Sequence, residues 1–183
     1  MKTTIKPCRV PWSISPTGSL VTLIHTETDI CPECCVVLGG ARLTTDLRRI
    51  EITFEACCFT RSGPKDDNAG VEALGYELDP TTPRIPMGDD FLNRYDALWH
   101  TIGHCPDSGF YVATRSTWLE SIPPLYRAGC QHYVICGRDG YVELIARGYK
   151  WLEREWTRDW TSAYGGPAAM VGKILDEGTG SDS

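Results

Sequence analysis

Apolar and polar residues alternate most regularly between residues 48 and 61, in the segment RRIEITFEACCFTR. One face of this alternation carries Ile50, Ile52, Phe54, Ala56 and Cys58. A period of two residues predicts a β-strand with one buried face and one largely solvated face. The same pattern puts Cys58 on the buried face and Cys57 on the other.

Shorter apolar runs predict further strands at 19–26, 34–40 and 108–114. Residues 71–78 are expected to pair back on the strand just described, and residues 131–149 predict a hairpin. The hairpin turn falls at Arg138-Asp139-Gly140, because an Asp-Gly step supplies the positive φ angles of a tight turn. Residues 150–160 fit either an edge strand or a helix with a tryptophan stripe.

The apolar spacing changes to three and four residues over 89–103, in DDFLNRYDALWHTIG. This period predicts an amphipathic helix that begins after the N-cap Asp89 and stops at Gly103. A second, short helix is predicted over 117–121, capped by Ser116 or Thr117, with Glu120 placed for a capping box.

Strands, then a helix, then more strands predict an α+β protein with a mainly antiparallel sheet packed against the helix at 89–103 and the short helix at 117–121. We expect a single domain over residues 1–162, of which 1–18 form an irregular arm rich in Pro, Ser and Thr. The Gly-rich segment 163–183 is predicted to be a mobile tail.

Composition narrows the class of protein. The chain has 183 residues, 42% of them apolar, which is enough for a real hydrophobic core. Its net charge is −6 and its largest basic cluster is the pair Arg48-Arg49, so we expect no nucleic-acid partner. No segment approaches the roughly 18 apolar residues of a membrane span, and we find no signal peptide. The expected location is the cytoplasm, where the nine cysteines would be reduced and mostly buried.

Residues 108–151 carry a pattern of Ser-x-Trp-Leu, His-Tyr-x-Ile, Asp and Val-Glu-x-Ile-Ala. The matching positions are Ser116, Trp118, Leu119, His132, Tyr133, Ile135, Asp139, Val142, Glu143, Ile145 and Ala146. This pattern resembles that of small uncharacterised bacterial proteins, some of which look like immunity proteins that neutralise a toxin by binding it. The resemblance covers about a quarter of the chain and implies no catalytic residue.

A zinc site is one hypothesis for the cysteine-rich first half. Cys31 and Cys34 have the spacing of half a tetrahedral zinc site, and His100 and His104 are candidates for the other two ligands. The alternative is that the thiols are packing residues. In that case residues 31–40, CPECCVVLGG, form a turn that leads into a buried strand, where Cys34 and Cys35 point to opposite faces.

Two further patterns suggest chemistry without completing a motif. A thiol nucleophile next to a histidine base has two candidate pairs, His104 with Cys105 and His132 with Cys136. Paired carboxylates have two candidate locations. Glu51 and Glu55 share a strand face, and Glu143 is a candidate partner of His132 across the hairpin.

These observations favour a non-catalytic binding protein, of the immunity or accessory type, that recognises a protein partner. The alternative is a small enzyme of specialised metabolism with a sheet-lined pocket for a small molecule, using His132 and Glu143 with Tyr133. A zinc-stabilised structural protein is the third hypothesis. Outside the zinc hypothesis, we expect no cofactor.

Overall fold

The computed structural model describes residues 2–14, 22–26, 33–42, 46–57, 59–65, 71–85, 88–137 and 140–155. Its strands are β1 (Thr4–Pro7), β2 (Ser13–Ile14), β3 (Thr22–Thr26), β4 (Glu33–Arg42), β5 (Asp46–Glu55), β6 (Phe59–Pro64), β7 (Glu77–Leu78), β8 (Phe110–Arg115), β9 (Gln131–Cys136), β10 (Gly140–Ala146) and β11 (Gly148–Glu155). Its helices are the 3-10 helix η1 (Val71–Leu74) and the α-helices α1 (Phe91–Ile102), α2 (Thr117–Ser121) and α3 (Pro124–Arg127). The predicted α+β class is confirmed, and nearly all strand pairs are antiparallel.

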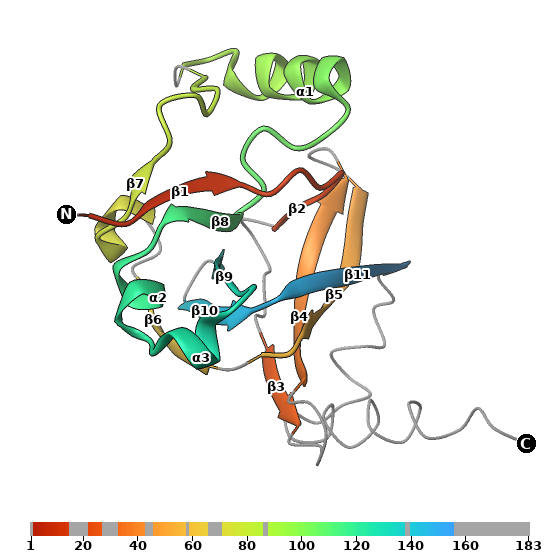
Figure 1. Cartoon of the computed structure of the whole chain (residues 1–183). Helices are drawn as coiled ribbons and strands as arrows, with labels where there is room; N and C mark the ends of the chain where they lie inside the picture. Colours follow the sequence, from red (N-terminus) through yellow and green to blue (C-terminus); the bar gives the residue numbers. More distant parts are fainter. Residues whose placement is uncertain are drawn as a thin grey trace, which may run out of the picture.

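The strands form two sheets rather than one. Sheet A has six strands in the order β6-β10-β9-β8-β1-β7. Sheet B has the order β11-β5-β4-β2, and β3 also pairs with β4. Figure 1 shows sheet A on the left and sheet B on the right, with β10 and β11 running in line from one to the other.

Two strand pairs connect the sheets at a corner. β6 pairs with β10 in sheet A, and the segments that continue them, β5 and β11, pair with each other in sheet B. Between the two ladders, the Arg147 amide donates a hydrogen bond of 2.9 Å to the carbonyl of Glu55. One long antiparallel pair therefore bends from one sheet into the other, as in packings where strands switch sheets at a bend.

The bend decides which cysteine is buried. Cys57 is 1% exposed, so its predicted place on the solvated face is wrong. The reason is Ala56, whose φ of 48° breaks the extended backbone and with it the two-residue alternation. Cys58 lies outside the described residues.

The main core lies between the two sheets. Sheet B contributes Val36, Leu38, Ile50, Ile52 and Phe54, and sheet A contributes Phe110, Tyr133, Ile135, Val142 and Leu144. Strand residues of one parity point inward on both sheets, as the alternation in β5 predicts. At the end of β4, the chain passes so close to Ile50 that a Cβ on Gly40 would lie 2.5 Å from Ile50 Cγ1.

The N-terminal segment is part of this core, and the predicted irregular arm over 1–18 is wrong for the residues described. β1 pairs with both β8 and β7 inside sheet A. Trp12 is fully buried and stacks on Phe110, with 6.0 Å between ring centroids. Alternation is too short here to be visible in the sequence, because β1 has four residues and β2 has two.

A second, smaller cluster covers the outer face of sheet A. It contains Ile5, Val71, Tyr76, Tyr111 and Val134. The predicted pairing of residues 71–78 with the long strand is wrong. Val71–Leu74 form η1, and β7 pairs in parallel with β1.

Helix α1 ends as predicted, because Gly103 adopts the left-handed conformation with φ of 72°. Its cap residue is Asp90 rather than Asp89, and that side chain does not cap a backbone amide. Figure 1 shows α1 above both sheets, next to the loop that leads to β8. Trp99 is the one residue of this helix that is buried. No helix in the described residues is long and apolar enough to cross a membrane.

The remaining local predictions largely hold. Ser116 caps α2, but the third helical residue is Leu119, so Glu120 is not in a capping-box position. The hairpin is confirmed, with Tyr141 opposite Cys136, while Arg138 and Asp139 lie outside the described residues. For residues 150–160 the sequence left open an edge strand or a helix. The part that the structure describes is extended, as the end of β11. Residues 156–183, with the predicted tail, lie outside the described residues.

Candidate functional site

His132 and Glu143 contact each other on the outer face of sheet A. They belong to the paired strands β9 and β10, where Glu143 lies opposite Val134 and Ile145 opposite His132. The two side chains are therefore diagonal neighbours on one face. His132 Nε2 lies 3.0 Å from Glu143 Oε2, which is the contact that the sequence suggested.

Arg61 of β6 binds the same carboxylate from the neighbouring strand. Arg61 lies directly opposite Glu143 in the ladder. Its Nε donates a hydrogen bond of 2.7 Å to Glu143 Oε2, and its Nη2 lies 2.5 Å from the same oxygen. Nη2 also lies 3.4 Å from the hydroxyl of Tyr76. A buried carboxylate is thus matched by a guanidinium whose side chain is 49% exposed.

Ser116 extends the network to α2. As the N-cap, its Oγ accepts a hydrogen bond of 2.9 Å from the Leu119 amide. The same Oγ lies 2.8 Å from His132 Nδ1. A neutral imidazole with its proton on Nε2 satisfies the whole chain, because Ser116 then donates to Nδ1 and Nε2 donates to Glu143.

Two aromatic rings pack against the His132 side of this network. The indole of Trp118 meets the His132 ring edge to face, with 5.1 Å between centroids, and Tyr76 contacts the same ring from another side. The Arg61 guanidinium lies over Trp118 at 4.2 Å from the ring centroid. Ser116, His132 and Glu143 are each at most 5% exposed.

The electrostatics of the network centre on the Glu143 carboxylate. Burial alone would raise the pKa of Glu143, but hydrogen bonds from His132, Arg61 and Tyr76 outweigh it, and the pKa is lowered. Burial alone would lower the pKa of Arg61, whereas the contact with Glu143 raises it. Burial and the nearby carboxylate raise the pKa of Tyr76. Glu143 is therefore ionised at neutral pH.

Ser, His and Glu are the residue types of a hydrolytic triad, but here each reactive atom already has a partner. A triad serine must present its oxygen to the substrate. The Ser116 oxygen instead caps α2 and contacts the imidazole, and only 5% of the residue is exposed. The arrangement ties β6, β9, β10 and α2 together, so it holds this corner of the fold in place.

The stability of the protein should decrease as pH falls below about 4.5, the usual pKa of a glutamate. The pKa of Glu143 is lower in the folded protein than in the unfolded chain, so the unfolded chain binds the proton first as the pH falls. One such group lowers the free energy of unfolding by at most about 1.4 kcal/mol per pH unit. Urea unfolding of the native protein and of Glu143→Gln between neutral and acidic pH isolates this residue. We expect the gap between the two proteins to shrink on acidification; a gap that stays constant would contradict the assignment.

Tyr133, the third predicted catalytic residue, is not brought to this site. It points to the opposite face of sheet A, into the core, where its ring lies 5.3 Å from that of Phe54. Its hydroxyl donates to Gln131 Oε1 at 2.8 Å. Adjacent residues of a strand face opposite sides, so Tyr133 cannot accompany His132. Tyr76 supplies the phenol at the site instead.

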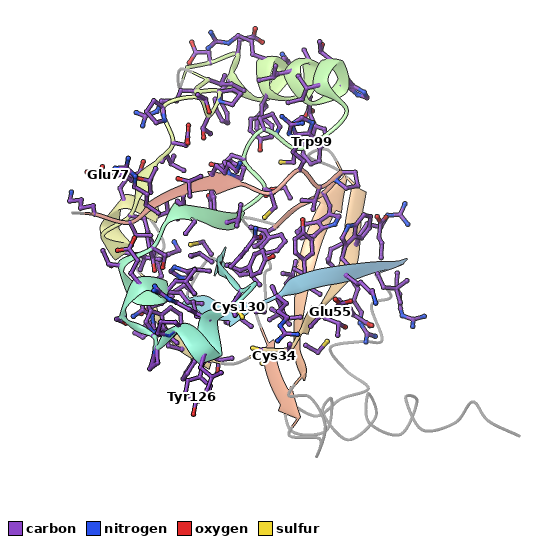
Figure 2. The ribbon with its side chains drawn as sticks, viewed as in Figure 1. Cys34, Glu55, Glu77, Trp99, Tyr126 and Cys130 are labelled. Atoms are coloured by element: carbon purple, nitrogen blue, oxygen red, sulfur yellow. The ribbon has the colours of Figure 1, made fainter. Side chains whose placement is uncertain are left out.

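The structure does not bring together the described ligands of the zinc site predicted from Cys31, Cys34, His100 and His104. Cys34 is fully buried in the core beside Cys57. Figure 2 shows Cys34 near the bottom of the molecule and Trp99 of α1 near the top, far from each other. His100 belongs to α1, and His104 Nδ1 lies 2.9 Å from the Ile102 carbonyl just beyond it. No group of three metal-binding side chains occurs among the described residues, and Cys31 lies outside them.

The cysteine faces, by contrast, follow the prediction. Cys34 is fully buried, and Cys35 on the opposite face is partly exposed. The hydrogen bond with Cys57 and burial both raise the pKa of the Cys34 thiol. Cys34 is therefore a packing residue of the core, which is the alternative that the sequence analysis set beside the zinc site.

The thiols considered as nucleophiles are poorly suited to that role. Burial raises the pKa of Cys105 to about 11 and that of Cys136 to about 12. Both therefore stay protonated near neutral pH, whereas the thiolate is the nucleophile. Cys105 Sγ lies 3.0 Å from the Tyr95 hydroxyl, whereas His104 Nδ1 contacts the Ile102 carbonyl at 2.9 Å.

The carboxylates of β5 form ion pairs of their own, away from His132. Glu55 contacts Lys150 at 2.7 Å, and Glu51 contacts Arg49 and Arg154 on the outer face of sheet B. Glu143 belongs to sheet A, so the three glutamates do not share a site. Sequence reasoning also missed Arg61 and Tyr76, because nothing local shows that β6 lies beside β10.

Comparison of the chain with protein-family models, curated proteins and solved structures finds no match. The resemblance of residues 108–151 to immunity-like proteins therefore stays an expectation.

Proposed function

We propose that this protein is a non-catalytic binding protein of the immunity or accessory type, which recognises a basic protein partner. The proposed contact is an aromatic surface over β6, α2 and α3, made by Phe59, Arg61, Trp118, Leu125 and Tyr126. The observation that carries the proposal is the exposure of α3, where Leu125 is 82% and Tyr126 58% exposed. Figure 2 shows Tyr126 pointing away from the body of the protein.

The members of this surface lie next to one another. Arg61 stacks on Trp118, which joins β6 to α2. Arg127 of α3 donates to the carbonyl of Glu120 in α2 at 3.2 Å, which joins the two helices. Phe59, 39% exposed, shares a face of β6 with Arg61. Trp, Tyr and Arg are the residue types most enriched at binding hot spots.

The layer below this surface favours binding over catalysis. The Ser116, His132 and Glu143 network holds Trp118 and Arg61 in position, which reduces the ordering that a partner would have to impose. β6 is also the last strand of sheet A, and in the described chain nothing pairs with its outer edge. Such an edge can accept an extended segment of a partner. The net charge of −6 favours a partner of opposite sign.

The test compares capture by the native protein with capture by two surface variants. The double variant Leu125→Ser/Tyr126→Ala removes the most exposed part of the surface. Leu92→Ser is the matched control, because Leu92 is 59% exposed on α1 at the other end of the molecule. We expect the native protein and the control to retain one basic protein from cell extract, and the double variant to bind it at least about tenfold more weakly.

Neutralisation is tested with the captured protein itself. Produced alone, it should arrest growth, and co-production of the native protein or Leu92→Ser, but not of the double variant, should restore it. Equal capture by the double variant would remove the aromatic surface from the proposal. Absence of any specifically retained protein would remove the binding function.

A further inference from the structure

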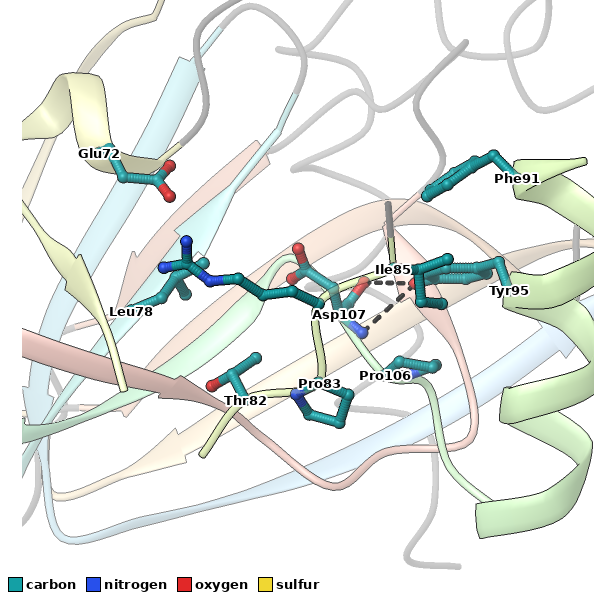
Figure 3. A pocket seen from close by; sticks show the side chains of 10 residues that line it. Glu72, Leu78, Thr82, Pro83, Ile85, Phe91, Tyr95, Pro106 and Asp107 are labelled. Atoms are coloured by element: carbon teal, nitrogen blue, oxygen red, sulfur yellow. Dashed lines mark hydrogen bonds between the residues drawn. The ribbon is translucent and has the colours of Figure 1, made fainter. Parts of the chain in front are cut away.

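A pocket of about 270 Å³ lies away from the aromatic surface, between α1 and the segment from η1 to Ile85. Figure 3 shows Glu72 and Leu78 on one side, Phe91 and Tyr95 of α1 on the other, and Asp107 between them. Its volume is slightly below the range of about 300–1,000 Å³ for drug-sized ligands, which suits a molecule of amino-acid size.

Asp107 presents a positioned carboxylate to this pocket. The Tyr111 hydroxyl donates a hydrogen bond of 2.7 Å to Asp107 Oδ1. The backbone of Asp107 is also fixed, because the Tyr95 hydroxyl donates to its carbonyl at 2.9 Å. Within the described chain, Asp107 Oδ2 accepts no hydrogen bond, so one oxygen of an oriented carboxylate remains for a donor such as an ammonium group.

The guanidinium of Arg84 also lines the pocket, together with Glu72 but without an ion pair to it. Arg84 lines the pocket and, among the residues described, forms neither an ion pair nor a hydrogen bond. A guanidinium presents a planar fork of donors that matches a carboxylate. Thr82 adds a hydroxyl that is buried, with the residue 8% exposed, and that has no partner in the described structure. Buried polar atoms without partners are rare in folded proteins and call for an explanation.

Apart from Glu72, which adds a second carboxylate, the rest of the lining is mainly apolar. The rings of Phe91 and Tyr95 lie 5.6 Å apart and form one wall, and Leu78 and Ile85 also line the pocket. Besides Glu72, the pocket therefore combines the oriented Asp107 carboxylate, a guanidinium, a hydroxyl without a partner in the described structure and an aromatic wall. A ligand that uses all four has a positive group, a negative group and a small apolar body.

We propose that this pocket binds a free α-amino acid with an apolar side chain. Asp107 receives the ammonium group, Arg84 and Thr82 receive the carboxylate, and the side chain lies against Phe91 and Tyr95. This site is separate from the aromatic surface of the proposed function, and either can fail without the other.

The experiment is titration calorimetry on the full chain with three probes that share one ring. L-Phenylalanine carries both charges, 2-phenylethylamine lacks the carboxylate, and 3-phenylpropanoate lacks the ammonium. We expect L-phenylalanine to bind at least about tenfold more tightly than either of the others. If 2-phenylethylamine binds as tightly as L-phenylalanine, the pocket is a cation site. If 3-phenylpropanoate does so, it is an anion site. Either result overturns the proposal.

Variants then assign each charge. Arg84→Gln should lower the affinity for L-phenylalanine at least about tenfold and leave that for 2-phenylethylamine unaffected. Asp107→Asn should also weaken binding of L-phenylalanine, but it should leave the affinity for 3-phenylpropanoate unaffected. Arg9→Gln and Glu120→Gln, both on exposed residues outside the pocket, are the matched controls and should bind as the native protein does. Circular dichroism verifies that each variant is folded.

Thr82→Val gives a third, independent measurement. The hydroxyl has no partner to lose within the described residues, so the melting temperature should not fall, while binding of L-phenylalanine should weaken. Absence of binding by L-phenylalanine and L-leucine at about 20 mM, or equal binding by Arg84→Gln, Asp107→Asn and the controls, would overturn the proposal.

Discussion

Glu143→Ala is expected to lower the free energy of unfolding by about 3–4 kcal/mol. The substitution removes the acceptor shared by His132 and Arg61. His132 is 1% exposed, so its Nε2–H would be left buried without a partner. Arg61 is half exposed and can turn to water, which keeps the expected cost below the upper end for a broken buried ion pair.

The matched control is Glu55→Ala. Glu55 is also a strand glutamate with an ion pair, at 2.7 Å from Lys150, but both side chains are largely exposed. Exposed pairs of this kind contribute about 0–1 kcal/mol. Urea unfolding followed by circular dichroism measures both variants at neutral pH. If Glu143→Ala costs no more than Glu55→Ala, the buried network does not hold this corner of the fold.

Glu143→Ala also separates the two roles of the network. The substitution loosens the support of Trp118 and Arg61, so binding of the captured partner should weaken even under conditions where the variant is fully folded. The Leu92→Ser control should again bind as the native protein does. Unchanged partner binding by folded Glu143→Ala would show that the aromatic surface does not depend on the layer beneath it.

Trp12→Ala is expected to cost about 3–5 kcal/mol, a large share of the stability of a typical domain. Trp12 is fully buried, stacks on Phe110 and meets Trp151 edge to face. Alanine leaves a cavity between the two sheets that the strands cannot close without shifting. The effect would show that the N-terminal segment is part of the domain core.

Trp12→Phe is the matched control. It keeps an aromatic ring on Phe110 and removes an indole N–H that has no partner in the described structure, so we expect a cost of about 1–2 kcal/mol. Circular dichroism is the suitable probe, because the substitutions change the tryptophan fluorescence. A Trp12→Ala protein as stable as Trp12→Phe would mean that this position does not fill the core.

Several predictions held because their signals are local. The alternation in β5, the helical spacing of α1 and the left-handed stop at Gly103 depend on neighbours within one element. The predicted hairpin of β9 and β10 was also confirmed, because the pairing register of a hairpin is set by its turn. The contact of His132 with Glu143 followed from that hairpin.

The errors arose where a distant part of the chain decides the outcome. Residues 71–78 have strand character, yet β7 pairs with β1, some seventy positions away in the sequence. The exposure of Cys57 depends on the bend at Ala56, which serves the passage from sheet B to sheet A. The described zinc candidates do not come together, because Cys34 lies in the core between the sheets whereas His100 belongs to α1.

The sequence by itself determined the class of the fold, most of its strands, the two α-helices that carry clear end signals, and one contact of the candidate site. Only the tertiary structure decided that there are two sheets, that Trp12 belongs to their core, and that Arg61, Tyr76 and Ser116 complete the network around His132. The physical reason is range: periodicity and capping depend on interactions within a few residues, whereas strand order and burial depend on which segments the whole chain brings together.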